Sequence, residues 1–327
     1  MFSVRHLQHR REELQEQYDA LSEKIKRLRL DSVIQAGTSI AFQLEKEIEQ
    51  AEAKRTSLVE EIDSLEKSSE IRCIRNALFR LNYIKQVGLF KQFREKERRI
   101  GAFLVHGLPE HGQIFLLKRL LDPIADISVT PPIHFDVSSR TFKPKVEYLW
   151  RQLARDMEIH NPSQEQVIKG IVARLQNQHV ILVFNYLDSL YQDYLQQLIS
   201  DFWLPLVNSI QQPIHTNNKY FLLMFLVDHD GCVSTWYDRF ADTVDSVWEP
   251  CTPIRLPIID RLSDEILTGW IENAINELPH KLIQAEIDYT VNLILEKSEG
   301  IPERVFGEIV NLCGCDWAKG EKLWSEL

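Results

Sequence analysis

The amino-acid sequence predicts an α/β fold: a parallel sheet with helices on both faces, preceded by a helical hairpin and followed by a helical lid. Three observations support this prediction. Apolar residues recur at heptad spacing through the first third of the chain. Short apolar runs then alternate with helical patterns, and the pattern after Ser263 is helical throughout. Alternating strands and helices are typical of a parallel sheet covered on both faces.

The first helix carries one leucine every seven residues. This row consists of Leu7, Leu14, Leu21 and Leu28, and a second row consists of Val4, Arg11, Tyr18 and Ile25. Apolar rows at this spacing, flanked by charges, are typical of a coiled-coil seam. A break follows at Gly37, which can end the helix, and Ser39 can cap the next one.

The second helix repeats the pattern in alternating steps of four and three residues. Its seam consists of Leu44, Ile48, Ala51, Arg55, Leu58, Ile62 and Leu65. Two amphipathic helices of similar length around a short turn predict an antiparallel coiled-coil hairpin over residues 1–70. The pattern allows pairing within one chain or between chains. We interpret the hairpin as a docking or oligomerising module, with a spacer as the alternative.

A linking helix over residues 71–99 leads into the alternating region. Strands are predicted at 102–106, 133–137, 180–184, 221–227 and 254–256. Helices are predicted near 113–121, 143–158, 164–175, 189–210 and 233–242, and then at 263–277, 283–298, 302–313 and 318–326. The predicted domains are therefore the hairpin, the linking helix, an α/β domain over 100–260 and a helical lid over 261–327.

Composition narrows the function classes. The longest apolar run, Phe221 to Val227, is far shorter than the ~18 residues of a membrane span. The N-terminus leads straight into a charged helix, and the five cysteines are an odd, scattered set. We therefore expect a cytoplasmic protein with reduced thiols and no membrane partner.

Charge argues against nucleic acid as the partner. Residues 1–100 hold 20 Lys/Arg against 17 Asp/Glu, whereas the remainder holds 18 against 31. An acidic globular part lacks the cationic surface that supplies most non-specific affinity for phosphate backbones. The basic stretch 91–99 is either a contact for an anionic partner or a solvated helix end.

A phosphate loop is predicted between the first strand of the sheet and the next helix. Gly107 and Gly112 give the frame G-x-x-x-x-G. In a working loop the next two residues are a lysine that reaches the phosphates and a Ser/Thr that ligates Mg²⁺. Here they are Gln113 and Ile114. A neutral amide and an isoleucine remove the electrostatic stabilisation that usually contributes most to catalysis.

The second acidic position of such a site is also replaced. The run ending at Phe184 has the apolar character of the strand that carries the metal-binding carboxylate, but the terminal residue is Asn185. Asp188 lies three residues further on and is a partial substitute at best. The sequence thus predicts a degenerate P-loop NTPase-like domain with no catalytic residue, no metal site and no cofactor. Phosphate binding by backbone amides without turnover stays open.

Much of the region 75–326 resembles the inactive STAND family, non-catalytic relatives of signal-transduction P-loop ATPases. The residues that carry the resemblance lie in stretches 82–90, 101–107 with 112–113, 135–136, 201–206, 223–228, 270–273, 300–303 and 311–317. Gly300-Ile-Pro302 resembles the G-x-P element that approaches the nucleotide base from the lid in active STAND proteins. Residues 42–49 resemble coiled-coil modules attached to such proteins.

The resemblance implies a STAND/AAA+-like domain and a role in assembling bacterial, notably cyanobacterial, defence or signalling complexes. We therefore expect a non-catalytic adaptor with protein partners, and self-association through the hairpin is open to it. The alternatives are a nucleotide sensor that binds without hydrolysis and a weak, atypical NTPase. We expect no winged-helix or repeat domain after residue 327, which puts autonomous nucleotide-switched oligomerisation in doubt.

Three other groups of residues suggest a function, but each also has an ordinary structural explanation. His229 and Cys232 suggest a thiol protease, but catalytic Cys–His pairs are usually distant in sequence. Cys313 and Cys315, together with His229 and Cys232, suggest a zinc site. The alternative is that these cysteines are small residues buried in the core. Trp236 and Trp248 suggest an exposed contact surface. The alternative is that both pack in the core.

Overall fold

The computed structural model describes residues 4–34, 39–96, 98–124, 131–160, 162–211, 219–274, 278 and 286–314. The chain divides into two compact units. One is Met1–Leu78 with Asn273–Gln284, and the other is Phe79–Glu272 with Ala285–Leu327. The turn predicted at Gly37 and the helix predicted at 318–326 lie outside the described residues.

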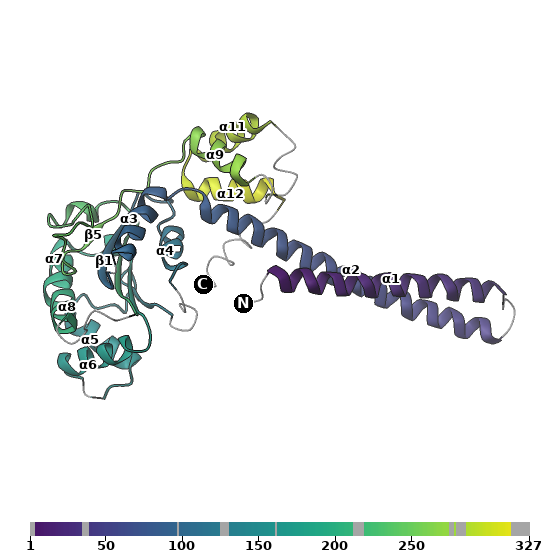
Figure 1. Cartoon of the computed structure of the whole chain (residues 1–327), viewed down its shortest axis with the longest axis horizontal. Helices are drawn as coiled ribbons and strands as arrows, with labels where there is room; N and C mark the ends of the chain where they lie inside the picture. Colours follow the sequence, from purple (N-terminus) through teal and green to yellow (C-terminus); the bar gives the residue numbers. More distant parts are fainter. Residues whose placement is uncertain are drawn as a thin grey trace. The chain divides into compact units, whose positions relative to one another are not determined.

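The first unit contains a helical hairpin. Helix α1 (Val4–Ile34) and the first part of α2 (Ser39–Arg80) run side by side in opposite directions (Figure 1). Two ion pairs join them: Arg10 with Glu61 at 3.0 Å and Arg29 with Glu52 at 2.5 Å. Exposed pairs of this kind contribute little to stability, so the apolar seam has to hold the hairpin together.

The seam residues take the positions that the heptad pattern predicts. Leu14, Ile25 and Ala51 are buried within the single chain. Half-buried beside them are Tyr18, Leu21, Leu28, Leu44, Ile48, Arg55, Leu58 and Ile62. The side chains of Leu7 and Leu65 lie outside the described residues. The hairpin therefore buries its apolar stripe between its own two helices.

The linking helix predicted over 71–99 is two helices in the structure. Helix α2 continues to Arg80, and α3 spans Ile84–Glu95. Between them Asn82 and Tyr83 adopt left-handed backbone angles, with φ of 65° and 63°. Asn tolerates this region better than most residues, and a helix cannot continue through it. Apolar periodicity alone does not reveal such a break.

The second unit is built on a five-stranded parallel sheet in the order β2-β3-β4-β1-β5. The strands are β1 (Ile100–His106), β2 (Ile133–Asp136), β3 (Val180–Asn185), β4 (Leu222–Asp228) and β5 (Ile254–Arg255). Strand β1 therefore lies between β4 and β5. The predicted α/β fold with a parallel sheet is confirmed.

Helices cover both faces of this sheet (Figure 1). One face carries α5 (Val146–Asp156), α6 (Gln164–Leu175), α7 (Gln192–Gln197) and α8 (Leu204–Gln211), with a π-helical stretch Leu198–Trp203 joining the last two. The other face carries α3 and α4 (Gln113–Leu121).

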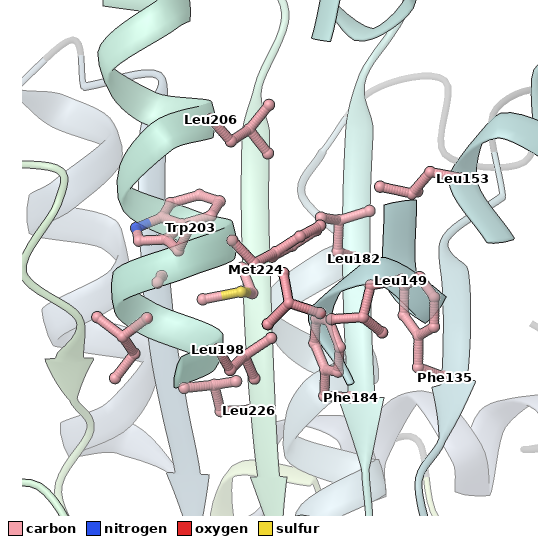
Figure 2. Packing of buried hydrophobic residues seen from close by; sticks show 14 of the residues in the cluster. Phe135, Leu149, Leu153, Leu182, Phe184, Leu198, Trp203, Leu206, Met224 and Leu226 are labelled. Atoms are coloured by element: carbon pink, nitrogen blue, oxygen red, sulfur yellow. The ribbon is translucent and has the colours of Figure 1, made fainter. Parts of the chain in front are cut away.

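The core on the first face is aliphatic and aromatic (Figure 2). Trp203, Leu206 and Met224 belong to this cluster, and Leu149 of α5 lies near Phe135. Phe135 and Phe184 stack at 4.7 Å between ring centroids. Full burial of a side chain of this size stabilises the fold by about 1.5–3 kcal/mol.

The core on the opposite face is a cluster of phenylalanines. Phe90 and Phe93 of α3 meet Phe103 of β1 edge-on, at 5.1 Å and 5.0 Å between ring centroids. Phe225 of β4 stacks on Phe103 at 5.6 Å. Edge-on aromatic pairs add to the gain from burial. This cluster fixes α3 beside the strand that leads into the predicted phosphate loop.

The helix predicted over 233–242 is wrong. The segment contains only a short 3₁₀ turn, Val233–Thr235, and Ala241 then bridges to Ile254 of β5. The segment carries Val233, Phe240 and Val244, whose spacing resembles a helical period, and all three are buried. The chain instead buries them from an irregular path, because the Ala241 backbone bonds to Pro253 and Arg255.

The lid lies C-terminal to the sheet. It contains α9 (Asp264–Ala274), α11 (Ile287–Ser298) and α12 (Pro302–Leu312). Proline is favoured in the first turn of a helix, where its missing N–H costs nothing, and α12 begins in this way. In the described part of the chain, no helix combines the length and the apolar character needed to cross a bilayer.

Candidate functional site at the phosphate-loop position

The predicted loop lies between the end of β1 and the start of α4, and its two glycines are required by close neighbours. A Cβ on Gly112, whose φ is 80°, would lie 2.3 Å from the Tyr83 hydroxyl oxygen. A Cβ on Gly107 would lie 3.1 Å from the Cβ of Ile259 and 3.2 Å from the Cβ of His111. The frame of a phosphate loop is thus retained, although it is packed against protein atoms.

Gln113 is turned into the loop. Its side chain is 1% exposed, and its Nε2 donates to the carbonyl oxygens of Gly107 at 2.8 Å and Leu108 at 3.0 Å. An amide can donate two such bonds but carries no charge. Gln113 therefore keeps the loop closed without supplying the cation that a triphosphate needs. Ile114 is half-buried and offers no ligand for a metal ion.

Tyr83 holds the loop from the other side. It is 2% exposed, and its hydroxyl donates to the carbonyl of Gly112 at 3.1 Å. Burial raises the pKa of this hydroxyl far above its usual range, so it stays a neutral donor. Phe306 of the lid meets Tyr83 edge-on at 6.4 Å and Phe115 of α4 at 5.2 Å. Aromatic side chains thus fill the space beside the loop.

The lid is fastened to the loop by Glu110. Its carboxylate Oε2 accepts from Arg304 Nε at 2.9 Å and Nη2 at 2.5 Å. Its carbonyl accepts from the backbone N–H of Glu303 at 3.1 Å. Glu110 itself has a φ of 63°, a region that non-glycine residues rarely adopt. These contacts join residues that are 194 positions apart in the sequence.

Gly300 and Pro302 place the start of α12 against this loop. Gly300 has a φ of 72°, and a Cβ there would lie 2.6 Å from the Leu262 carbonyl oxygen. The Gly300 carbonyl accepts from Leu262 N at 2.7 Å. Pro302 is buried at the first position of the helix. The structure therefore brings the G-x-P element and the loop glycines to one site.

Asn185 lies two strands away from the loop strand, because β4 separates β3 from β1. Its Oδ1 accepts a hydrogen bond from His229 Nε2 at 2.8 Å. Tyr186 stacks on the His229 ring at 4.5 Å, and Asp188 Oδ1 accepts the backbone N–H of His229 at 2.8 Å. Asn185 and Asp188 thus hold a histidine, and their geometry offers no paired carboxylates for a metal.

Asp228 is the fully buried carboxylate of this edge. It accepts the backbone N–H groups of Asp230, Gly231 and Val233 at 3.1, 2.9 and 2.8 Å. Burial raises the pKa of the Asp228 carboxyl above its usual range. This residue shapes the turn after β4, which returns to the loop: a Cβ on Gly231 would lie 3.4 Å from the Gly107 carbonyl oxygen.

The two histidines that flank the loop are packed into the fold. His106 Nε2 donates to the Leu256 carbonyl at 2.8 Å, and burial lowers the pKa of its ring. His111 Nδ1 donates to the Pro109 carbonyl at 3.0 Å. Their bonds to backbone carbonyls make them structural donors.

The thiol-protease hypothesis does not fit the geometry. His229 bonds to Asn185, and burial raises the pKa of the Cys232 thiol, which is the opposite of nucleophile activation. Zinc is not supported either: among the described residues no three candidate ligands gather, and Cys315 lies outside them. Trp248 is buried, with its Nε1 donating to the Thr252 carbonyl at 3.0 Å, and Trp236 is half-buried.

The basic stretch 91–99 is used within the domain. Arg94 donates to the Pro123 carbonyl at 3.0 Å, and Lys96 donates to the Val244 carbonyl. The guanidinium groups of Arg98 and Arg99 lie over the rings of Trp248 and Phe221, at 5.8 Å and 4.9 Å. The interpretation as an anionic-partner site gains no support from this arrangement.

Sequence reasoning missed several residues of the site. Tyr83, Glu110 and Arg304 contact the positions identified from the sequence, but their roles depend on three-dimensional proximity. His229 was identified only for other chemistry, as a thiol-protease or zinc candidate. The only signal for Tyr83 was its place in a stretch that resembles the family.

One family model matches part of the chain. Residues 78–227 match the model of the inactive STAND family. The resemblance inferred from the sequence is therefore confirmed over this range, which covers a little less than half of the chain. None of the curated proteins matches the chain significantly.

Similar solved structures include two ORC proteins of Aeropyrum pernix. The ORC2 protein with ADPNP and ADP is 13% identical, with a TM-score of 0.44, and the match covers 76% of this chain and 70% of that chain. The ORC1 protein in complex with DNA is 16% identical, with a TM-score of 0.37, and the match covers 72% of this chain and 60% of that chain. The Cdc6p protein of Pyrobaculum aerophilum is 13% identical, with a TM-score of 0.36 and coverage of 68% and 64%.

Proposed function

We propose that this chain is a non-catalytic adaptor that binds protein partners in a bacterial signalling or defence complex. The observation that carries the proposal is the closed phosphate loop. Both amide hydrogens of Gln113 are donated to carbonyl oxygens of the loop itself, and the Tyr83 hydroxyl donates to the Gly112 carbonyl from the other side. A site filled by its own side chains is suited to holding a fold, and poorly suited to turning over a nucleotide.

The missing charges support this proposal quantitatively. Loss of one preorganised donor to a developing negative charge typically lowers turnover by about 10²–10³-fold. Here the lysine, the metal-binding hydroxyl and the metal-binding carboxylate are replaced by Gln113, Ile114 and Asn185. We therefore expect losses at three such positions to leave no measurable hydrolysis.

Exposed apolar residues at the same edge of the sheet support a protein partner. Leu108 of the loop, Tyr186 after β3 and Tyr191 before α7 are 51%, 40% and 82% exposed. The His229–Gly231 turn connects the first two, since Tyr186 stacks on His229 and Leu108 lies beside Gly231. Aromatic residues are enriched in protein interfaces, so this edge is the candidate docking surface.

The hairpin supplies the second element of the adaptor. We propose that it sets partner choice or oligomeric state, because its outer surface remains available once the seam is buried between α1 and α2. Leu30 and Ile40 are 60% and 50% exposed on these two helices.

Calorimetry with ATP, ADP and GTP in the presence of Mg²⁺ tests the nucleotide side of this proposal. We expect no binding heat and no phosphate release above background. Binding without release would support the alternative of a nucleotide sensor. Release that disappears in a Gly112→Pro variant would instead identify a weak, atypical NTPase and contradict the proposal.

Affinity capture from the native host tests the partner side. The bait is the full-length chain, compared with a variant that carries Leu108→Ser and Tyr191→Ser. The control is Val247→Ser, since Val247 is 82% exposed beside the buried Trp248. We expect the partner to be lost from the first variant and retained by the control. Equal recovery from all three baits would exclude this edge as the docking surface.

A further inference from the structure

A concave site lies at the edge of the sheet opposite to β5. It is a groove of about 350 Å³, lined by the four residues of β2, by α5 and by the loop between them. Its volume falls in the range of ligand sites, roughly 300–1,000 Å³. The lining residues are different from those of the phosphate-loop site.

The groove follows the edge of β2 rather than one face of the sheet. Successive side chains of a strand point to opposite faces, yet all four residues from Ile133 to Asp136 line the groove. Among the described strands, β2 pairs with β3 alone, so its other side forms the sheet edge. An edge strand presents backbone donors and acceptors to whatever lies beside it.

The register identifies which backbone groups face outward. The N–H of Val137 donates to the Asn185 carbonyl of β3 at 3.1 Å. The backbone N–H and C=O groups of the odd-numbered residues of β2 therefore point toward β3. Alternation then directs the N–H and C=O of His134, together with the N–H of Asp136, toward the groove. Within the described chain His134 makes no backbone hydrogen bond on this side. Such a pattern is complementary to an extended peptide.

Helix α5 forms the facing wall. Its lining residues Tyr148, Gln152, Arg155 and Asp156 are spaced as one face of a helix. Phe142 meets Tyr148 edge-on at 5.5 Å, which sets the start of α5 beside the loop that follows β2. The helix therefore runs along the groove, and Arg155 lies toward the beginning of β2. A strand edge facing a helix is the arrangement in which several peptide-binding domains add a strand.

The charges of the groove define the partner further. Asp136 Oδ1 accepts from Ser138 N at 3.0 Å and from Ser138 Oγ at 2.6 Å. Asp156 pairs with Arg174 at 2.5 Å. The Arg155 side chain, in contrast, makes no hydrogen bond or ion pair within the described part of the chain; the backbone carbonyl of Arg155 accepts from Glu158 N at 3.1 Å. The charge left for a ligand is thus a guanidinium, which favours a carboxylate.

We propose that this groove binds an extended segment of a partner protein as an added strand on β2, with an acidic side chain at Arg155. The inference rests on the proposed function, because it assigns a surface to the protein partner of the adaptor. Backbone bonds to His134 supply affinity, and the α5 wall with Phe142 supplies selectivity for side chains. Because β2 has only four residues, we expect the bound segment to be short.

The test begins with a random heptapeptide display library selected on the immobilised full-length protein. Enriched peptides are then labelled and titrated by fluorescence polarisation. The decisive variant is His134→Pro, which removes one outward donor and leaves the β2–β3 bonds intact, since proline is tolerated where an edge N–H faces outward. Its matched control is His134→Ala, which keeps the N–H. We expect the proline variant to bind about tenfold more weakly, and the alanine variant to bind like the wild type.

Two further measurements keep the proposal testable if His134→Pro does not fold. Arg155→Glu should reject the acidic peptides that the wild type selects. Amide hydrogen exchange at His134 and Asp136 should slow when a peptide binds the wild type. Binding that is indifferent to both variants, or a library that yields no peptide, would overturn the proposal.

The experiments distinguish a failure of the groove proposal from a failure of the adaptor proposal. If the docking is between two copies of this chain, light scattering shows a doubled mass that His134→Pro reduces, which would also overturn the partner-peptide assignment. A captured host partner that is retained by both groove variants would leave the adaptor function standing and remove only the groove from it.

Discussion

The contact between Gly112 and Tyr83 makes a quantitative prediction about how tightly the loop is packed. A Gly112→Ala variant places a Cβ 2.3 Å from the Tyr83 hydroxyl oxygen, at a φ of 80°. The left-handed conformation costs alanine roughly 1–2 kcal/mol. Overpacking adds about 1–3 kcal/mol. We therefore expect the single variant to lose about 2–5 kcal/mol of unfolding free energy.

A second substitution separates these two costs. Tyr83→Phe removes the oxygen atom that the new Cβ would meet, and by itself forfeits the hydrogen bond to the Gly112 carbonyl, at about 1–3 kcal/mol. In the double variant the steric cost disappears, whereas the backbone strain and the lost hydrogen bond remain. The double variant should therefore be about 1–3 kcal/mol more stable than the sum of the single effects predicts.

Urea denaturation followed by tryptophan fluorescence measures this coupling. All seven tryptophans lie between Trp150 and Trp324, so the signal reports the α/β unit and the lid without the hairpin. Additive single effects, to within about 0.5 kcal/mol, would refute the reasoning, because they would mean that Gly112 and Tyr83 do not touch.

Three further predictions concern the seam, the replaced residues and the histidines His106 and His229. Leu21→Asp with Leu58→Asp should melt the hairpin, because a charge in the seam is either buried unpaired or opens the seam. Circular dichroism should then show lost helix, while tryptophan fluorescence stays unchanged. Unchanged mass and unchanged partner recovery would mean that the hairpin is only a spacer. Gln113→Lys, Ile114→Thr and Asn185→Asp together should not restore rapid ATP hydrolysis, since Tyr83 and Phe306 still fill the site; phosphate release at the rate of active relatives would contradict this. Burial lowers the pKa of His106 and His229, so the unfolded chain binds more protons near pH 5–6, and stability is lost as the pH falls through about 6.5. A variant with both histidines changed to Gln should lose less stability between pH 7 and pH 5, and an unchanged pH slope would rule the two rings out as its cause.

The fold was largely predictable because its signals are local. Each central strand is a run of apolar residues between turns, and buried parallel strands have this character. The seam of the hairpin follows from heptad spacing alone. The errors occur where local signals conflict with packing: apolar residues near Phe240 are spaced like a helix, and Asn82 interrupts a pattern that continues on both sides.

The site was predictable only in its outline. The glycine spacing located the loop, and the identity of Gln113 predicted the missing charge. Its second role, in which the amide bonds to the carbonyls of Gly107 and Leu108, depends on a side-chain rotamer that sequence does not specify. The pair of Glu110 and Arg304 is formed by tertiary folding across the whole domain, so no local pattern contains it.

The lengths of the two outer strands have a consequence for the behaviour of the protein in concentrated solution. Strand β5 has two residues and β2 has four, whereas the three strands between them have six or seven. A long, flat, apolar edge is a template for sheet-to-sheet aggregation, and short edge strands are one way in which proteins prevent it. Polar His134 and Asp136, both exposed, interrupt the outer strand further. The domain can therefore keep one edge open for a short segment without that edge seeding fibres of its own chain.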